Sequence, residues 1–118
     1  MDIEIRARNL KLTTAQRDLC EKRVGAALDR FEARLRRVLV VLEDLNGPKG
    51  GADTRCKVRV TGLRGLGVQA QATDISVAAA VDRACDAIGR NVAKAFARAK
   101  DFTARDRTSM AGERRTRR

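Results

Sequence analysis

The chain contains no histidine, no tryptophan and no tyrosine. Histidine is the side chain that most often moves protons near neutral pH, and it is the commonest metal ligand in proteins. Its absence argues against acid–base catalysis and against a metal centre. The Cys-x-x-Cys pair, the nucleophile elbow and the dinucleotide-binding fingerprint are missing as well. We predict that the protein is not an enzyme and that it has no catalytic residue, no metal, no cofactor and no small-molecule substrate.

Aromatic residues are scarce, since three phenylalanines are the only ones among 118 residues. Phe31 and Phe96 fall at apolar positions of helical repeats, which leaves Phe102 without an assigned place in the core. Proteins that bind single-stranded nucleic acid commonly stack its bases on aromatic side chains. That mode is disfavoured here, so a nucleic-acid partner would be recognised by its backbone and its shape.

Long apolar runs are absent, and cysteines are few. No segment approaches the roughly 20 apolar residues of a membrane-spanning helix, and the first residues lack the basic and then apolar order of a signal peptide. We therefore expect a cytoplasmic protein with no membrane partner. Cys20, Cys56 and Cys85 lie far apart at apolar positions, so we expect reduced core cysteines, with a metal or redox role as the alternative.

The chain has an excess of positive charge. It carries 26 lysines and arginines against 15 acidic residues, a net charge of +11. Residues 103–118 hold six arginines and two acidic residues, or +4, so +7 remains on residues 1–102. An excess of this size favours a polyanionic partner. We expect one domain over residues 1–102, followed by a basic, disordered tail over residues 103–118.

Hydrophobic periodicity predicts the order of the structural elements. Strict alternation over Asp2–Arg8 predicts a strand. Thr13 and Gln16 have the spacing of a capping box, which opens a helix that should end near Arg36. The elements expected after this helix are strands over Val38–Leu42, Arg55–Thr61 and Val68–Thr73, and a helix over Val77–Lys100 capped by Asp74 or Ser76.

This order, β-α-β-β-β-α, predicts an α+β fold. The short links between the last three strands imply antiparallel pairing, and the apolar stripes of both helices would cover one face of a four-stranded sheet. One link contains the turn-rich segment Asn46–Gly51, which lacks the Gly-Lys-Ser/Thr ending of a phosphate-binding loop. We interpret it as a plain connection in which Lys49 could still touch a phosphate.

The last helix is the most informative element, because its two long sides differ in character. At about 100° per residue, its apolar residues gather on one side and a basic stripe lies opposite. The stripe consists of Arg83, Arg90, Lys94 and Arg98. The first helix also sorts its charges, with arginines on one flank and acidic residues on the other. The alternative is a solvated helix with many local salt bridges, although such salt bridges would mix positive and negative residues on the same flank.

The third strand has a basic face formed by Arg55, Lys57 and Arg59. Such residues could contact RNA. They could equally serve to keep the strand from pairing with another sheet edge, which lysine and arginine do well. The sequence leaves both interpretations open.

Several short segments together resemble a known family. They are Ile3-Glu4-Ile5, Asn9-Leu10 and Leu12-Thr13 at the start, Asn46-Gly47-Pro48-Lys49-Gly50-Gly51 with Arg55-Cys56 in the middle, and Ala72-Thr73-Asp74 with Ala78-Ala79-Ala80-Val81-Asp82-Arg83 at the last helix. In this order, over Asp2–Lys100, they are similar to the ribosome hibernation promoting factors. These proteins are also called ribosome-associated inhibitors or sigma-factor modulation proteins. The separate C-terminal domain of the long form has no counterpart, so we expect the short form.

The resemblance implies a domain related in shape to double-stranded RNA-binding domains. It would dock on the small ribosomal subunit, in the channel for messenger and transfer RNA, and so repress translation in resting or stressed cells. Its rRNA contacts would be basic residues of the two helices, with a secondary set on the loop and third strand. The first set is Lys22, Arg23, Arg30, Arg83, Arg90, Lys94 and Arg98, and the second is Lys49, Arg55, Lys57 and Arg59.

Two other functions stay open from the sequence. One is a general double-stranded RNA-binding module or RNA chaperone without preference for ribosomes. The other is a protein-interaction domain that acts on an acidic transcription factor. Neither the oligomeric state nor the choice between promoting and preventing ribosome dimers follows from the residues.

Overall fold

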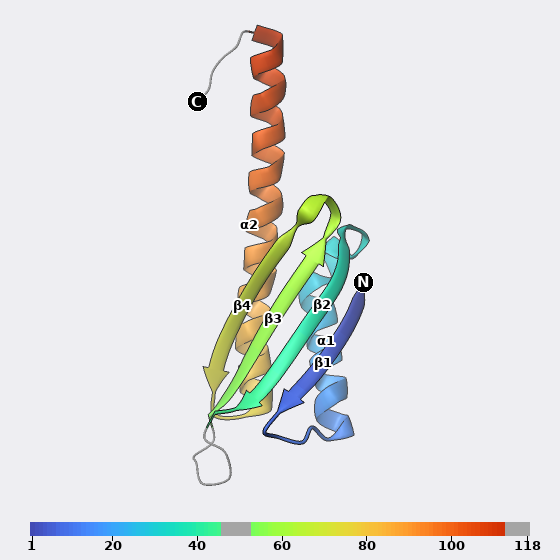
Figure 1. Cartoon of the computed structure of the whole chain (residues 1–118), viewed down its shortest axis with the longest axis vertical. Helices are drawn as coiled ribbons and strands as arrows, with labels where there is room; N and C mark the ends of the chain where they lie inside the picture. The colour runs from blue at the N-terminus through green and yellow to red at the C-terminus, as the bar shows by residue number, and fades with distance from the viewer. Residues whose placement is uncertain (46–52, 113–118) are drawn as a thin grey trace.

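A computed structural model of the chain describes residues 1–45 and 53–112, with side chains as far as Arg98. Its elements follow the predicted order β-α-β-β-β-α (Figure 1). They are β1 (Asp2–Arg8), α1 (Thr14–Leu28), the 3-10 helix η1 (Asp29–Arg34), β2 (Leu35–Asp44), β3 (Thr54–Gly62), the 3-10 turn η3 (Leu63–Gly65), β4 (Gly67–Asp74) and α2 (Val77–Gly112). The predicted Asn46–Gly51 connection, with Lys49, lies outside the described residues.

The four strands form one sheet in the order β1-β2-β3-β4. β1 and β2 are parallel, because helix α1 carries the chain back across the sheet between them. β2, β3 and β4 pair in antiparallel fashion. Both helices lie on the same side of this sheet, behind it in Figure 1. The predicted α+β fold is therefore confirmed.

The core lies between the helices and the covered face of the sheet. Alternate residues of the strands point into it, and each helix adds a stripe of apolar side chains. Burying each large aliphatic side chain contributes about 1.5–3 kcal/mol, so this layer is the main source of stability. The largest fully buried side chains are Val24 and Leu28 of α1, Val38, Val40 and Leu42 of β2, Val58 and Val60 of β3, and Val81, Ile88 and Val92 of α2.

Both α-helices begin at a side-chain cap. Thr13 Oγ1 accepts a hydrogen bond from the Gln16 amide, and Gln16 Oε1 accepts one from the Thr13 amide, each at 3.0 Å, which confirms the predicted capping box. At α2, Ser76 Oγ accepts from the Ala79 amide at 3.2 Å. The cap of α2 is therefore Ser76, because the Asp74 carboxylate is turned to the Ile75 amide instead.

The first helix ends earlier than its apolar spacing predicts. Regular α-helix stops at Leu28, and the chain continues as η1 instead of reaching Arg36. A 3-10 turn accommodates the same spacing of three to four residues and still buries Phe31 in the core. Leu35 then has an extended backbone, so β2 starts there and not at the predicted Val38.

The last helix is longer than predicted. It runs past Lys100 to Gly112, and in Figure 1 it projects beyond the end of the sheet. The disordered tail over residues 103–118 stays a prediction. None of the helices in the described part of the chain is both long and apolar enough to cross a membrane.

The three cysteines are reduced and buried in the core, as predicted. Burial raises the pKa of Cys20 to about 11 and that of Cys85 to about 12 from an ordinary value of 9.0. Desolvation raises the pKa of Cys56 further still. A thiol that is both inaccessible and protonated reacts slowly, because the thiolate is the nucleophile. Among the described residues, no group of three or more acidic or cysteine side chains could hold a metal ion.

We predict that the native thiols resist labelling. At pH 8 the folded protein should react with a thiol reagent far more slowly than the protein in guanidinium, where all three cysteines are exposed. Raising the pH to 9.5 should increase the labelling rate of the unfolded protein much more than that of the folded protein. The thiols of the unfolded chain have an ordinary pKa of 9.0, whereas the buried thiols of the folded protein stay protonated. A Thr61→Cys variant, with a new thiol at an exposed position, is the positive control. Rapid labelling of any native thiol in the folded wild type would contradict this description of the core.

β3 ends where two backbone segments approach closely. A Cβ atom on Gly62 would lie 2.5 Å from the carbonyl oxygen of Arg34 and 3.1 Å from Cδ2 of Leu66. The carbonyl belongs to the backbone and cannot rotate away. By contrast, a Cβ on Gly67, at the start of β4, would meet no atom within 4 Å.

We therefore predict that Gly62→Ala lowers the free energy of unfolding by about 1–3 kcal/mol, as overpacking does. Gly67→Ala should change it by less than about 0.5 kcal/mol. Urea denaturation of the two variants beside the wild type measures the difference. Equal stability of the two variants would mean that the Gly62 contact does not constrain the turn.

Candidate nucleic-acid interface

The predicted contact residues lie on two opposite surfaces of the domain. The outer side of the helix layer carries the first set, on α1, η1 and α2. The uncovered face of the sheet carries Arg55, Lys57 and Arg59 on β3. Because the sheet and the core separate these surfaces, one flat partner cannot touch both.

On α2, the basic stripe runs along the side that faces β4. Two side chains fix this orientation: Arg83 Nη1 donates to the Thr73 carbonyl at 3.0 Å, and Asn91 Nδ2 donates to the Gln69 carbonyl at 3.2 Å. Arg90 is seven residues after Arg83, so it shares the same side of the helix. Lys94 and Arg98 continue the stripe at intervals of four residues, and all of its members are exposed.

The other side of α2 faces α1 and carries acidic residues. Arg23 Nε of α1 lies 2.6 Å from Asp82 Oδ1, in an ion pair whose geometry is not that of a hydrogen bond. Farther along, the two helices lie close together at Gly89, where a Cβ would come within contact distance, 3.4 Å, of the Ala27 carbonyl oxygen. Asp86 is one turn after Asp82 and exposed. The carboxylates of Asp82 and Asp86 therefore form an acidic strip between the basic stripe of α2 and helix α1. As a result, the basic residues of α1 and those of α2 do not form one continuous patch.

A second group of cations gathers where η1 meets α2. The guanidinium carbon of Arg30 lies 4.8 Å from the ring centre of Phe31, and that of Arg34 lies 4.5 Å from the ring centre of Phe96. The two rings are themselves 5.3 Å apart. Arg34 was not among the predicted contacts, because its position over Phe96 depends on packing between elements distant in sequence. A guanidinium held against a ring keeps its N–H groups available at the edge.

The predicted residues of the helix layer therefore fall into two groups. Arg23 and Arg83 are engaged inside the domain, with Asp82 and with β4 respectively. Of the predicted residues, Lys22, Arg30, Arg90, Lys94 and Arg98 are exposed and form no ion pair within the part of the chain that the structure describes, with Arg30 lying over the Phe31 ring.

The basic face of β3 is not an edge-protection device. β3 lies inside the sheet, between β2 and β4, so it has no free edge to protect. Arg55 donates to Glu43 Oε1 at 2.5 Å, which compensates its charge. Lys57 and Arg59 are exposed and have no ion-pair partner among the described residues. One of the two interpretations left open by the sequence is thus removed.

Comparison with known proteins identifies the family. The chain belongs to the sigma 54 modulation protein / S30EA ribosomal protein family, which matches residues 3–100. The resemblance noted in the sequence is thereby confirmed. This is a family of ribosome-associated modulation proteins, which are not enzymes; that this chain catalyses no reaction stays a prediction. The comparison with curated proteins returns no match.

Two solved structures share the fold. The N-terminal domain of Thermus thermophilus Protein Y is 33% identical, with a TM-score of 0.64 over 78% of this chain and 96% of that chain. A ribosomal subunit interface protein from Coxiella burnetii has a TM-score of 0.69 over 82% of this chain and 99% of that chain. At 17% identity, the second structure supports the fold alone.

Substitutions of the α2 residues that bond to β4 and of the α2 residues that are merely exposed should affect stability differently. Arg83→Gln with Asn91→Ala removes both hydrogen bonds from α2 to β4, and should lower the free energy of unfolding by about 1–2 kcal/mol. Arg90→Gln with Lys94→Gln should change it by less than about 0.5 kcal/mol. Chemical denaturation gives the free energies, and amide hydrogen exchange should be faster in β4 for the first variant only. Equal values for both variants would show that Arg83 and Asn91 do not hold β4.

Proposed function

We propose that the protein is a ribosome hibernation factor of the cytoplasm. It binds rRNA of the small ribosomal subunit in the channel for messenger and transfer RNA, and it represses translation in resting or stressed cells. Membership of the S30EA ribosomal protein family supports the partner. The observation that carries the contact surface is the row of exposed cations on α2, namely Arg90, Lys94 and Arg98, which form no ion pair with any side chain that the structure describes.

The binding mechanism follows from the kind of charge on this row. Lysine and arginine neutralise phosphates and release condensed counterions, so affinity falls steeply as salt rises. The scarcity of aromatic residues disfavours stacking on unpaired bases, which is how sequence is usually read in RNA. The protein therefore recognises the path of an RNA backbone, and inhibition is steric: while the domain occupies the channel, messenger and transfer RNA are excluded.

The acidic strip of Asp82 and Asp86 orients the domain. It lies between the α2 row and α1, so a phosphate backbone laid across both helices would pass over two carboxylates. Like charges repel, and phosphates are therefore directed to the β4 side of α2. Arg23, already paired with Asp82, contributes less to binding than Arg90 or Lys94.

The test is charge reversal on the α2 row. Arg90→Glu with Lys94→Glu should weaken binding to purified small subunits by on the order of 100-fold at 0.1 M salt, since two phosphate contacts are lost and two repulsions are added. Sedimentation through a salt series measures the affinity, and circular dichroism verifies the fold. The matched control is Lys11→Glu with Arg64→Glu, the same change of charge at exposed positions outside the helix face. Undiminished binding by the folded α2 variant would reject the assigned surface.

A competition experiment separates ribosome recognition from general RNA binding. Small subunits should displace the protein from arbitrary hairpin RNA at much lower concentration than the same hairpin displaces it from subunits. Equal affinities for the two RNAs would instead support a general double-stranded RNA-binding module.

A further inference from the structure

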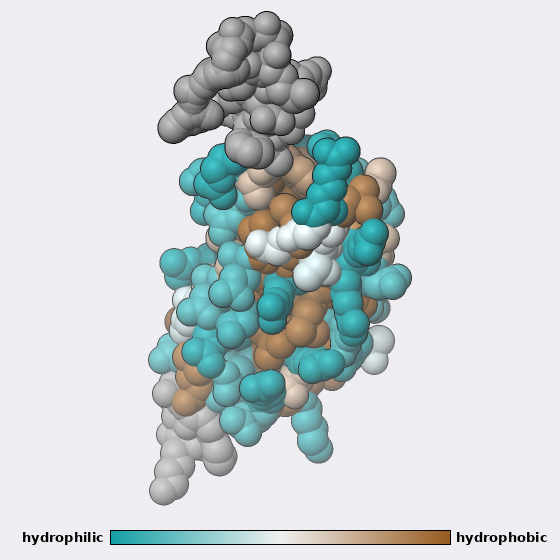
Figure 2. Space-filling view, turned by 45° about the horizontal axis from the view of Figure 1, so that its top comes forward, coloured by the Kyte–Doolittle hydropathy of each residue, from teal (hydrophilic) through white to brown (hydrophobic). Residues whose placement is uncertain are grey.

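The sheet has two edges at which a further strand could add. Among the strands that the structure describes, β1 and β4 each have a neighbour on one side only. An edge strand presents backbone N–H and C=O groups that a second copy of the chain can bond. The open face is less suited to such association, because Figure 2 shows hydrophilic residues over much of it, with hydrophobic surface between them. Attraction between copies would therefore come from an edge.

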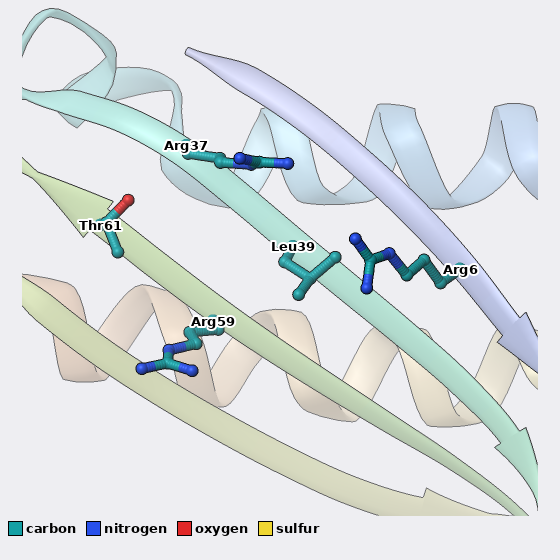
Figure 3. Close-up of a pocket in the computed structure, with 5 residues that line it drawn as sticks. All are labelled: Arg6, Arg37, Leu39, Arg59 and Thr61. Atoms are coloured by element: carbon teal, nitrogen blue, oxygen red, sulfur yellow. The ribbon is translucent and has the colours of Figure 1, made fainter.

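Charged side chains protect the β1 edge. Four of the seven residues of this strand are charged, namely Asp2, Glu4, Arg6 and Arg8. Figure 3 shows Arg6 extending over the open face toward Arg37, above Leu39 in a shallow hollow. Glu4 accepts hydrogen bonds from both arginines, from Arg6 Nε at 2.6 Å. Charges of this kind on an edge strand hinder its pairing with another sheet.

The β4 edge has no comparable protection within its own sequence. Residues 67–73 include no charged residue and no proline, which are the usual means of blocking an edge strand. Their side chains are small or neutral, so a copy of the same strand could approach closely. Whatever prevents pairing at this edge must come from another element.

Every second residue of β4 directs its backbone groups away from β3. At the turn, the Gly62 amide donates to the Leu66 carbonyl at 3.1 Å, so these residues form a bonded pair. Bonded and non-bonded pairs alternate along an antiparallel ladder, and the pairing of β3 with β4 continues without a shift. Gln69, Gln71 and Thr73 therefore occupy non-bonded positions, and their N–H and C=O groups point outward from the sheet.

Two of these outward carbonyls accept hydrogen bonds from side chains of α2, which runs behind β4 in Figure 1. Arg83 Nη1 donates to the Thr73 carbonyl, and Asn91 Nδ2 donates to the Gln69 carbonyl. The spacings agree, because eight residues of helix rise about 12 Å and four residues of strand span about 13 Å. Each contact occupies an acceptor and places a side chain where the next strand would lie.

Pairing at this edge would also cover the basic row of α2. Arg90 and Lys94 are on the side of α2 that faces β4, so two copies joined through β4 would bring their rows together. The like charges of the two rows repel each other, and salt screens this repulsion. The contacts at the edge and the charge of the row thus oppose the same association.

We propose that Arg83 and Asn91 are edge caps, which prevent β4 from pairing with β4 of a second copy and so keep the domain monomeric with its α2 row accessible. A similar contact occurs at the other edge, where Arg17 Nη1 of α1 donates to the Ile5 carbonyl at 3.2 Å. Without the caps, two copies of β4 would pair in antiparallel fashion about Gln71, since positions 69 and 73 lie symmetrically around it. The inference does not depend on which RNA the protein binds.

The first test is disulfide cross-linking through position 71. In an antiparallel pair centred there, the two Cα atoms would be about 5.5 Å apart, a distance that a disulfide spans. Gln71 is exposed and the native cysteines are buried, so Gln71→Cys reports on this contact alone. Adding Arg83→Gln and Asn91→Ala should accelerate formation of the cross-linked dimer by on the order of tenfold, because two carbonyls regain the capacity to pair. The comparison is made at about 0.5 M salt, which screens the α2 rows. Equal rates with and without the caps would overturn the proposal.

The second test is sedimentation equilibrium without a new cysteine. The apparent mass of Arg83→Gln with Asn91→Ala should rise toward twice that of the monomer as protein concentration increases, while the wild type stays monomeric. Gly62→Ala is the matched control, because it is also expected to lower stability but leaves both caps in place. Equal association of Gly62→Ala would assign the effect to lost stability and overturn the caps, as would a dimeric wild type.

A single substitution covers the case in which the double variant does not fold. Asn91→Ala frees only the Gln69 carbonyl and should associate more weakly than the double variant but more strongly than the wild type. Circular dichroism verifies the fold of each variant. A folded Asn91→Ala that stays as monomeric as the wild type, in the absence of a folded double variant, would also overturn the proposal.

Discussion

The whole domain depends on the burial of one face of a four-stranded sheet beneath two amphipathic helices. Val38, Val40 and Leu42 enter this layer from β2, and Val81 and Ile88 meet them from α2. The layer is the main source of stability, because disulfides are absent and no metal cluster is found among the described residues. It also dictates where charge can go: side chains that do not enter it must face outward from the helices or from the open sheet.

The two outer surfaces of the domain differ in how their charged side chains are paired. On the helix side, ties to neighbouring elements use part of the charge, since Arg23 pairs with Asp82 and Arg83 holds β4. Among the α2 side chains that the structure describes, the cations outside these ties form a narrow row bounded by an acidic strip, a shape suited to one RNA backbone. On the sheet side, Glu4 draws two arginines together around an apolar centre. Both surfaces are built on regular elements, so the backbone positions of their charged residues are fixed relative to one another.

Much of the fold could be predicted because the residue pattern is local. Alternation in β1 and the capping box at Thr13 report on neighbours within a few residues, and both appear as predicted. The end of α1 could not be located, since the same spacing suits an α-helix and a 3-10 turn. The candidate site was predicted less well, because the sequence does not distinguish an arginine that is exposed to solvent from one that bonds to another part of the domain. Only tertiary packing shows that Arg83 is tied to β4 and that Arg34 covers Phe96.

The central claim is that rRNA of the small subunit contacts the α2 row. A cryo-electron-microscopy map of the protein bound to small subunits tests it most directly. The account predicts the domain in the channel for messenger and transfer RNA, with rRNA phosphates within hydrogen-bonding reach of Arg90 and Lys94. A map in which these two side chains face solvent, or in which the domain lies outside the channel, would contradict it.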